Sequence, residues 1–149
     1  MKERDESPIV LIVSRVLSPF IMLFGAYVIA HGHYSPGGGF QGGAMLAASL
    51  LLIRLAAGSR ISDLQFKRTW SMPVGVLGVF IFFGVGLVAM FLGGEFLNYE
   101  YFFIPGVDGP MLRSLSILII EVGVGLAVMG MLVSIYDDLL EEDERREDL

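Results

Sequence analysis

"SMPVGVLGVFIFFGVGLVAMFLGG", residues 71–94, contains no charged side chain. A bilayer has a hydrocarbon core about 30 Å thick, and about 20 helical residues are needed to cross it. This stretch therefore predicts a transmembrane helix. The rest of the chain is similar in character, because 54% of its 149 residues are hydrophobic and its mean hydropathy is +0.70. A soluble domain of this size is seldom so apolar.

Three further apolar stretches lie on either side of this one. Together they predict an all-α integral membrane protein with a single domain and four transmembrane helices, at about residues 9–30, 40–57, 72–93 and 111–136. Arg54 falls near the end of the second helix, where its long side chain would have to snorkel toward water. We interpret the first helix as retained rather than as a signal peptide, because no A-x-A cleavage site follows it.

The end of the chain differs from the membrane part in charge. Eight of the sixteen acidic residues follow Tyr136. Residues 1–136 are therefore predicted to form the membrane domain, and residues 137–149 an acidic, solvated tail that lies in the cytoplasm.

The lysines and arginines predict the orientation. With four spans, the N-terminus, the 58–70 loop and the C-terminus share one side of the membrane. That side carries nine of the ten basic residues: Lys2, Arg4, Arg15, Arg54, Arg60, Lys67, Arg68, Arg145 and Arg146. The other side carries only Arg113. Because basic loops stay in the cytoplasm, both termini are expected to be cytoplasmic.

A glycine-rich stretch joins the first two predicted helices. "HGHYSPGGGFQGG", residues 31–43, contains both histidines of the chain and six glycines, with no charge. Pro36 cannot continue a helix, and the glycines after it can adopt positive φ. One interpretation is a tight outer hairpin with a helix-packing surface, formed by Ser35, Pro36, Gly37, Gly38, Gly39, Gly42 and Gly43. The alternative is a polar entrance lined by Gln41 and the amides of the glycines.

The histidines allow two interpretations as well. His31 and His33 offer two imidazoles, whereas a metal site needs three or four ligands, and no Asp, Glu or Cys lies nearby in the sequence. We therefore expect no metal site. A solvated pair at the membrane interface and a role in proton transfer both stay open.

Glu121 is the most informative single residue. It lies near the middle of the fourth predicted span, where an ionised carboxylate costs about 2.5–3.5 kcal/mol on insertion scales. Such a residue must face protein or water, and it is a candidate for an ion path. Gln41, His31 and His33 are the other candidates for that path. The alternative is a structural carboxylate that is protonated or hydrogen-bonded to a neighbouring helix.

No set of residues suggests catalysis. The sequence contains no nucleophile–base pair, no phosphate-binding loop and no haem-ligating motif, so we expect neither enzymatic activity nor a cofactor bound by this chain. We also expect no nucleic acid partner. One buried acid among four helices is little for a transporter, since ion routes need several polar groups in series. The chain is therefore predicted to be a subunit of a larger membrane assembly.

Two motifs resemble a known family. "LFGAYVIAHGHYSPGGGFQGG", residues 23–43, and "IIEVGVGLAVMG", residues 119–130, are similar to the MnhB family of Mrp-type multisubunit sodium/proton antiporters. The resemblance covers roughly residues 9–136, and Glu121 falls on the acidic position of the second motif. It implies a small, non-catalytic subunit of the cell membrane that packs beside other antiporter subunits, with sodium ions and protons as the transported species. Similar subunits occur in archaeal membrane-bound hydrogenase and sulfur-reducing complexes, so hydrogenase or sulfur-reductase subunits are further candidate partners.

The working hypothesis is a four-helix subunit of a sodium/proton antiporter module, either stand-alone or within a respiratory hydrogenase-type complex. Two alternatives remain: a purely structural scaffold subunit that binds lipid, and a free-standing four-helix channel or carrier.

Overall fold

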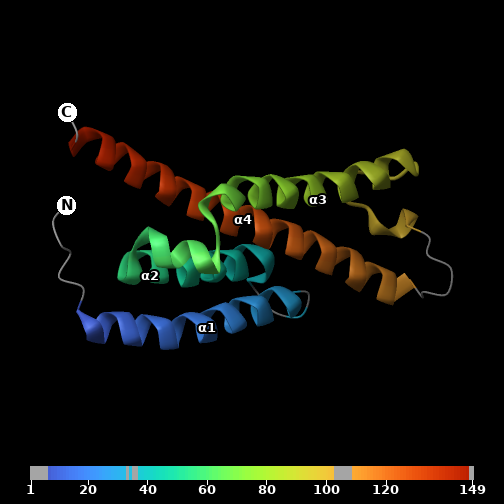
Figure 1. The fold of residues 1–149 in the computed structure, drawn as a ribbon. Helices are drawn as coiled ribbons and strands as arrows, with labels where there is room; N and C mark the ends of the chain where they lie inside the picture. The colour runs from blue at the N-terminus through green and yellow to red at the C-terminus, as the bar shows by residue number, and fades with distance from the viewer. Residues whose placement is uncertain (1–6, 33, 35–36, 103–108, 148–149) are drawn as a thin grey trace.

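Four long helices make up the protein (Figure 1). The computed structural model describes residues 7–32, 34, 37–102 and 109–147. Its helices are α1 (Pro8–Ala30), α2 (Gly38–Gln65), α3 (Ser71–Phe91) and α4 (Gly109–Glu147), with two short 3-10 turns, η1 (Arg68–Trp70) and η2 (Tyr99–Tyr101). Each long helix contains a segment long and apolar enough to cross a membrane. The prediction of an all-α protein with four membrane-spanning helices is therefore confirmed.

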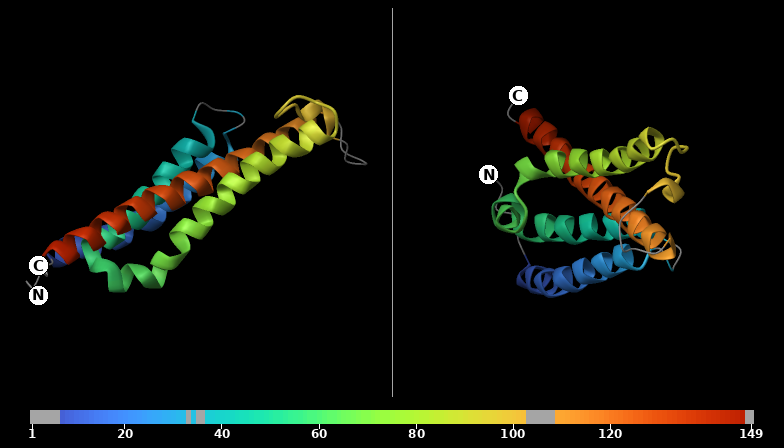
Figure 2. Two further views of the ribbon diagram at one scale, coloured as in Figure 1. Left: turned by 90° about the horizontal axis from the view of Figure 1, so that it is seen from above. Right: turned by 90° about the vertical axis from the view of Figure 1, so that its right-hand side faces the viewer.

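The helices form two hairpins, α1–α2 and α3–α4, which meet where α2 packs on α4. The order across the molecule is α1, α2, α4, α3, which is clearest in the right-hand view of Figure 2. The start of α1 and the end of α4 lie at the same end of the molecule, on the left of Figure 1. The cytoplasmic location of that end stays a prediction.

The two hairpins are staggered along their length (Figure 1). The turn between α1 and α2 lies beside Glu121 of α4, since a Cβ atom at Gly38 would be 2.6 Å from its Oε1. Two residues further along α4, Gly123 packs on the middle of α3, where its Cβ would be 3.0 Å from the carbonyl oxygen of Gly78. The α1–α2 turn therefore reaches only the level of the middle of α3, and the second half of α3 extends about 15 Å beyond it.

Glycines set the distances between the helices. A Cβ atom at Gly43 would lie 2.5 Å from the carbonyl oxygen of Gly125, and one at Gly42 would lie 2.7 Å from that of Gly25. The opposite faces of α2 thus approach α4 and α1 closely. Small residues at such positions let helix backbones pack tightly in a membrane, where close packing stabilises association.

Two serines add polar contacts between α1 and α2. The Ser18 hydroxyl donates to the carbonyl oxygen of Ser49 at 3.1 Å, and the Ser49 hydroxyl donates to that of Ser18 at 2.9 Å. Both residues are buried. The reciprocal bonds satisfy two hydroxyls that would otherwise be costly in an apolar environment.

The helix bounds differ from the prediction at two places. The second helix does not end near residue 57 but bends at Gly58, whose φ of 75° and ψ of 169° are not helical, and it then continues to Gln65. After the bend, the Gln65 amide donates to Ser18 Oγ at 3.4 Å. The fourth helix continues past Tyr136 to Glu147, because the residues that follow are mostly Leu, Glu and Arg, which favour helix. The other two helices match the prediction to within two residues.

The expectation that Arg54 snorkels toward water is wrong. Its residue is only 4% exposed, and its guanidinium forms an ion pair with Asp137 of α4 and donates to the Phe66 carbonyl oxygen at 3.0 Å. Asp137 is itself buried and so belongs to the packed part of α4 rather than to a solvated tail. Arg54 stays inside because a carboxylate and a carbonyl oxygen meet its charge there.

Two further residues complete this group, which we call the Arg54–Asp137 cluster. The Arg68 guanidinium donates to the carbonyl oxygen of Asp137 and to Glu141 at 3.3 Å, and the Ser71 hydroxyl donates to Asp137 Oδ2 at 3.4 Å. The cluster therefore joins α2, η1, α3 and α4.

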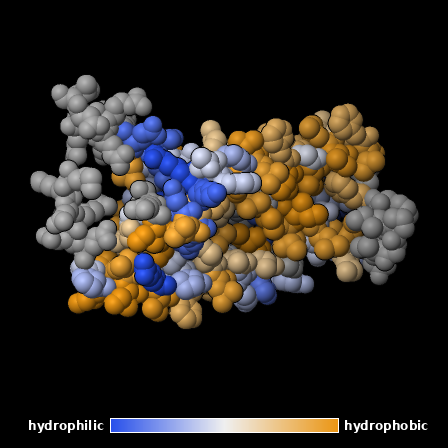
Figure 3. Space-filling view, in the orientation of Figure 1, coloured by the Kyte–Doolittle hydropathy of each residue, from blue (hydrophilic) through white to orange (hydrophobic). Residues whose placement is uncertain are grey.

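The surface of the molecule is largely apolar. Figure 3 shows hydrophobic residues over most of one face, with polar residues gathered toward the end where α4 terminates. Large exposed side chains occur on both outermost helices, such as Phe20 of α1 at 65% and Phe80 of α3 at 70%. Such surfaces suit contact with lipid or with other membrane helices.

Candidate ion-path site

Glu121 is enclosed by glycines from the other hairpin. Cβ atoms at Gly32 and Gly38 would collide with its carboxylate oxygens, and one at Gly39 would collide with its backbone carbonyl oxygen. We call Gly32, Gly38 and Gly39 the glycine cradle. The space that side chains would fill at these positions is the space that Glu121 occupies.

The local sequence explains the cradle. Gly37 and Gly38 have φ values of 129° and 42°, which L-residues with a side chain rarely adopt. They let the chain turn directly into α2, whose first residue, Gly38, lies against the carboxylate. The first amides of a helix have no partners within it, and the helix dipole favours negative charge at this end. The start of α2 therefore stabilises the ionised form of Glu121.

The depth of Glu121 follows from the stagger of the hairpins. It lies about a third of the way along α4 rather than at its middle, because α4 is longer than predicted at its C-terminal end. It is nevertheless level with the middle of α3, since Gly123 packs on Gly78 and Ile81. Its Oε2 atom is buried. If α3 spans the bilayer, this carboxylate lies near the middle of the membrane.

The other candidates lie around the turn. His31 is exposed and stacks on Tyr27, with ring centroids 4.1 Å apart, and its Nδ1 is 3.1 Å from the Tyr27 carbonyl oxygen. Gln41 is exposed and lies over Gly37, where a Cβ atom would meet its Oε1. His33, Ser35 and Pro36 lie outside the described residues. Within the described part of the chain, no three His, Asp or Glu side chains are placed to hold a metal ion.

The remaining glycines of the motif contact two different helices. Gly39 and Gly43 face α4, whereas Gly42 faces α1 near Gly25 and Ile29. The structure therefore brings Glu121 together with Gly32, Gly38 and Gly39. It uses Gly42 and Gly43 for packing between the helices.

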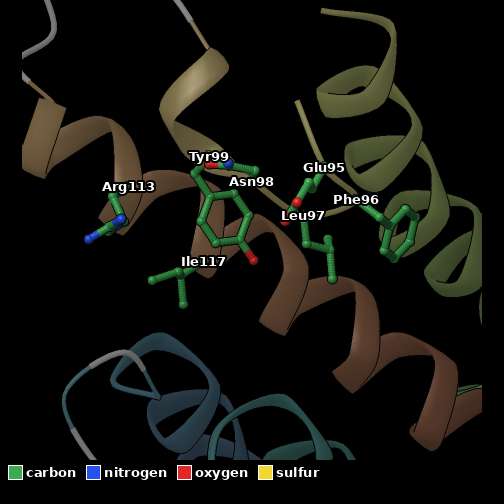
Figure 4. Close-up of a pocket in the computed structure, with 7 residues that line it drawn as sticks. All are labelled: Glu95, Phe96, Leu97, Asn98, Tyr99, Arg113 and Ile117. Atoms are coloured by element: carbon green, nitrogen blue, oxygen red, sulfur yellow. The ribbon is translucent and has the colours of Figure 1, made fainter. Parts of the chain in front are cut away.

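A pocket that the sequence did not predict opens at the far end of α4 (Figure 4). It measures about 390 Å³ and is lined by Glu95, Phe96, Leu97, Asn98, Tyr99, Arg113 and Ile117. Leu97 has a φ of 65°, which turns the chain after α3 back toward α4. We call this cavity the η2 pocket. Its only signal in the sequence is the run of polar residues in "EFLNYE", residues 95–100, together with the isolated Arg113.

Two interactions define the chemistry of the η2 pocket. Arg113 is paired with Glu100, with 3.2 Å between Nη2 and Oε1. Burial raises the pKa of Tyr99, so its phenol stays protonated at neutral pH and can donate a hydrogen bond. Glu95 contributes a carboxylate to the lining that is not matched by Arg113, whose charge is already balanced by Glu100.

Comparison with known proteins identifies the family. Residues 9–134 match the family described as a domain related to the MnhB subunit of Na+/H+ antiporter. The chain belongs to the MnhB family. The match includes the glycine cradle and Glu121 of this MnhB-family chain, and the family identification made from its two motifs is confirmed.

Individual relatives agree with this result. The MnhB-family chain is 33% identical over 135 residues to the second (B) component of the Na(+)/H(+) antiporter of Alkalihalophilus pseudofirmus, covering 88% of this chain and 90% of that protein. Its identity to the corresponding Na(+)/H(+) antiporter component of Bacillus subtilis is 29%, covering 96% and 100%. An uncharacterized protein of Methanocaldococcus jannaschii is 34% identical over 93 residues, which are 62% of this chain and only 35% of that protein. Together with the four apolar helices, these relatives confirm a multi-pass protein of the plasma membrane.

Proposed function

We propose that this chain is a membrane subunit of a multisubunit sodium/proton antiporter module and that Glu121 forms part of its cation path. Membership of the MnhB family and the names of two relatives that match nearly the whole chain support the first part. The second part rests on one observation, the placement of the Glu121 carboxylate in the glycine cradle at the level of the middle of α3.

The chemistry of such a site suits exchange between a proton and a cation. A carboxylate binds a proton covalently or Na+ electrostatically, and each excludes the other. The start of α2 favours the ionised form, so the proton can leave without a fixed positive side chain taking its place. Carboxylates that face protein inside a membrane commonly serve proton or ion routes. One such residue is not a complete route, so neighbouring subunits supply the rest.

The orientation proposed for this function places both termini in the cytoplasm, as the distribution of basic residues indicates. Because the chain has no cysteine, single cysteines report the side directly. Ser35→Cys is expected to react with an impermeant reagent only from outside, and Ser59→Cys only from the cytoplasm. Reaction of Ser35→Cys only from the cytoplasm would reverse the orientation.

The host of the module is the second question. The resemblance to subunits of hydrogenase and sulfur-reducing complexes supports a respiratory host, whereas the antiporter relatives support a stand-alone module. Native mass spectrometry of the complex purified through this chain distinguishes them. Subunits with nickel or iron–sulfur clusters indicate the respiratory host, other antiporter subunits alone indicate the stand-alone module, and a homo-oligomer contradicts the subunit proposal.

The test of Glu121 compares Glu121→Gln with Glu121→Ala. Sodium-dependent proton transport is measured in vesicles that contain equal amounts of assembled complex, and Glu141→Gln, which changes an exposed carboxylate on the same helix, is the matched control. The proposal predicts that Gln and Ala both abolish transport, that Gln leaves assembly intact and that the control transports normally. Full transport with Glu121→Gln would overturn the ion path and leave the scaffold function, which the close glycine packing around α4 favours.

A further inference from the structure

The η2 pocket and Glu121 share one side of α4. Ile117 lines the pocket and precedes Glu121 by four residues, so the two side chains are neighbours on the helix surface. Figure 4 shows the Ile117 side chain projecting from α4 between the pocket residues and the α1–α2 hairpin. Ile117 thus lies where the pocket ends and the surroundings of Glu121 begin.

The stagger of the hairpins leaves this side of α4 without cover from α1 and α2. Their turn ends at Glu121, whereas α4 continues for about three more turns toward Gly109. Along those turns, the described residues that lie over α4 on this side include η2 and the chain before it, which form the η2 pocket. Any approach to Glu121 from that end of the molecule along this side of α4 passes Ile117.

The charges of the pocket select cations. Arg113 is neutralised by Glu100, and Glu95 leaves one net negative charge in the lining, while Asn98 and the Tyr99 phenol offer further oxygen atoms. A cavity of about 390 Å³ has room for a hydrated monovalent ion. A negative, partly enclosed entrance raises the local concentration of cations.

We infer that the η2 pocket is the entrance through which hydrated cations approach Glu121 and that Ile117 is the hydrophobic gate between them. The inference rests on the proposed function of Glu121. A branched apolar side chain at a constriction excludes water, and it must move aside before a hydrated ion passes. Neither the pocket residues nor Ile117 exchange protons in this scheme; they control access.

The experiment uses the absence of native cysteine in this chain. Ile117→Cys is introduced into a complex whose other accessible cysteines have been replaced, and the purified complex is treated with a cationic methanethiosulfonate reagent before reconstitution. The gate predicts that the reagent labels the residue and lowers sodium-dependent proton transport about ten-fold, since a bulky cation fixed in a constriction blocks it. Ile119→Cys is the control, because Ile119 is exposed two positions further along α4 and so points away from this side. Labelling there should leave transport unchanged.

A size series at the same position provides a second measurement. Ile117→Ala should raise the transport rate or the leak of cations, and Ile117→Phe should lower transport, with equal amounts of assembled complex in each case. Equal transport by both variants, or labelling at Ile117→Cys without loss of transport, would overturn the gate. If Glu121→Gln abolishes transport in the same vesicles, that result overturns the gate alone; full transport with Glu121→Gln refutes the proposed function instead.

Discussion

Two carboxylates on α4 are held in opposite ways. Asp137 is buried beside the Arg54 guanidinium and accepts a hydrogen bond from Ser71, whereas Glu121 lies among backbone atoms of three glycines at the start of α2. The two are about 24 Å apart along the helix, close to the thickness of the hydrocarbon core. A carboxylate paired with an arginine is fixed in its charged state. One stabilised by a helix start keeps its charge available for exchange, so the comparison separates a structural acid from a functional one.

The largest expected effect is at the Arg54–Asp137 cluster. Asp137→Ala leaves the Arg54 charge buried without its carboxylate, at a cost of about 3–5 kcal/mol. We expect the complex to fail to accumulate in the membrane, as measured by immunoblotting and by the yield of intact complex.

The matched control replaces both partners at once. Arg54→Met with Asp137→Leu removes the charge as well as the carboxylate, and such apolar replacements of a buried pair are often neutral. Accumulation should return to near the wild-type level. A double variant that behaves like Asp137→Ala would show that the cluster has a function beyond charge balance.

The next effect is at the close contact of α2 with α4. In Gly43→Ala the new Cβ would lie 2.5 Å from the Gly125 carbonyl oxygen, so the helices must separate, at about 1–3 kcal/mol. The measurement is the melting temperature of the purified complex. Gly84→Ala is the control, since nothing lies within 4 Å of a Cβ atom there, and its melting temperature should be unchanged or slightly higher. Equal melting temperatures for both variants would refute the close packing.

Glu121→Gln is expected to change stability by about 1 kcal/mol or less, because the amide keeps the shape and hydrogen-bonding capacity of the side chain. Its melting temperature should therefore match that of the wild type even though transport is lost. This result sharpens the comparison, since the substitution at Asp137 acts on assembly and the one at Glu121 acts on transport. A large fall in melting temperature with Glu121→Gln would make both acids structural.

Truncation after Asp138 should have the smallest effect. It retains Asp137 and removes the exposed pair of Arg68 and Glu141, whose atoms are 3.3 Å apart and whose contribution is about 0–1 kcal/mol. Insertion and accumulation should be normal by membrane fractionation. Loss of the truncated chain from the membrane would mean that the last turns of α4 are needed for assembly.

The sequence predicted what depends on local composition. Apolar length identified four helices, and the small residues of the 31–43 stretch pointed to a close approach of helices. It did not predict which helix approaches, because the partner of Gly39 is Glu121, far along the chain. Arg54 was misjudged for the same reason, since Asp137 lies 83 residues away. The η2 pocket was missed because the turn at Leu97 has a positive φ that no glycine announces.

The stagger of the two hairpins also has a consequence for the bilayer. The apolar surface of α1 lies nearer the end of the molecule where the chain begins, and that of α3 extends about 15 Å past the α1–α2 turn. A flat bilayer about 30 Å thick cannot match both surfaces while the helices stand upright. The molecule must tilt, the bilayer must change thickness between its two sides, or adjacent proteins must cover the offset surface. Hydrophobic mismatch thus favours an assembly in which neighbouring chains, rather than lipid alone, surround this protein.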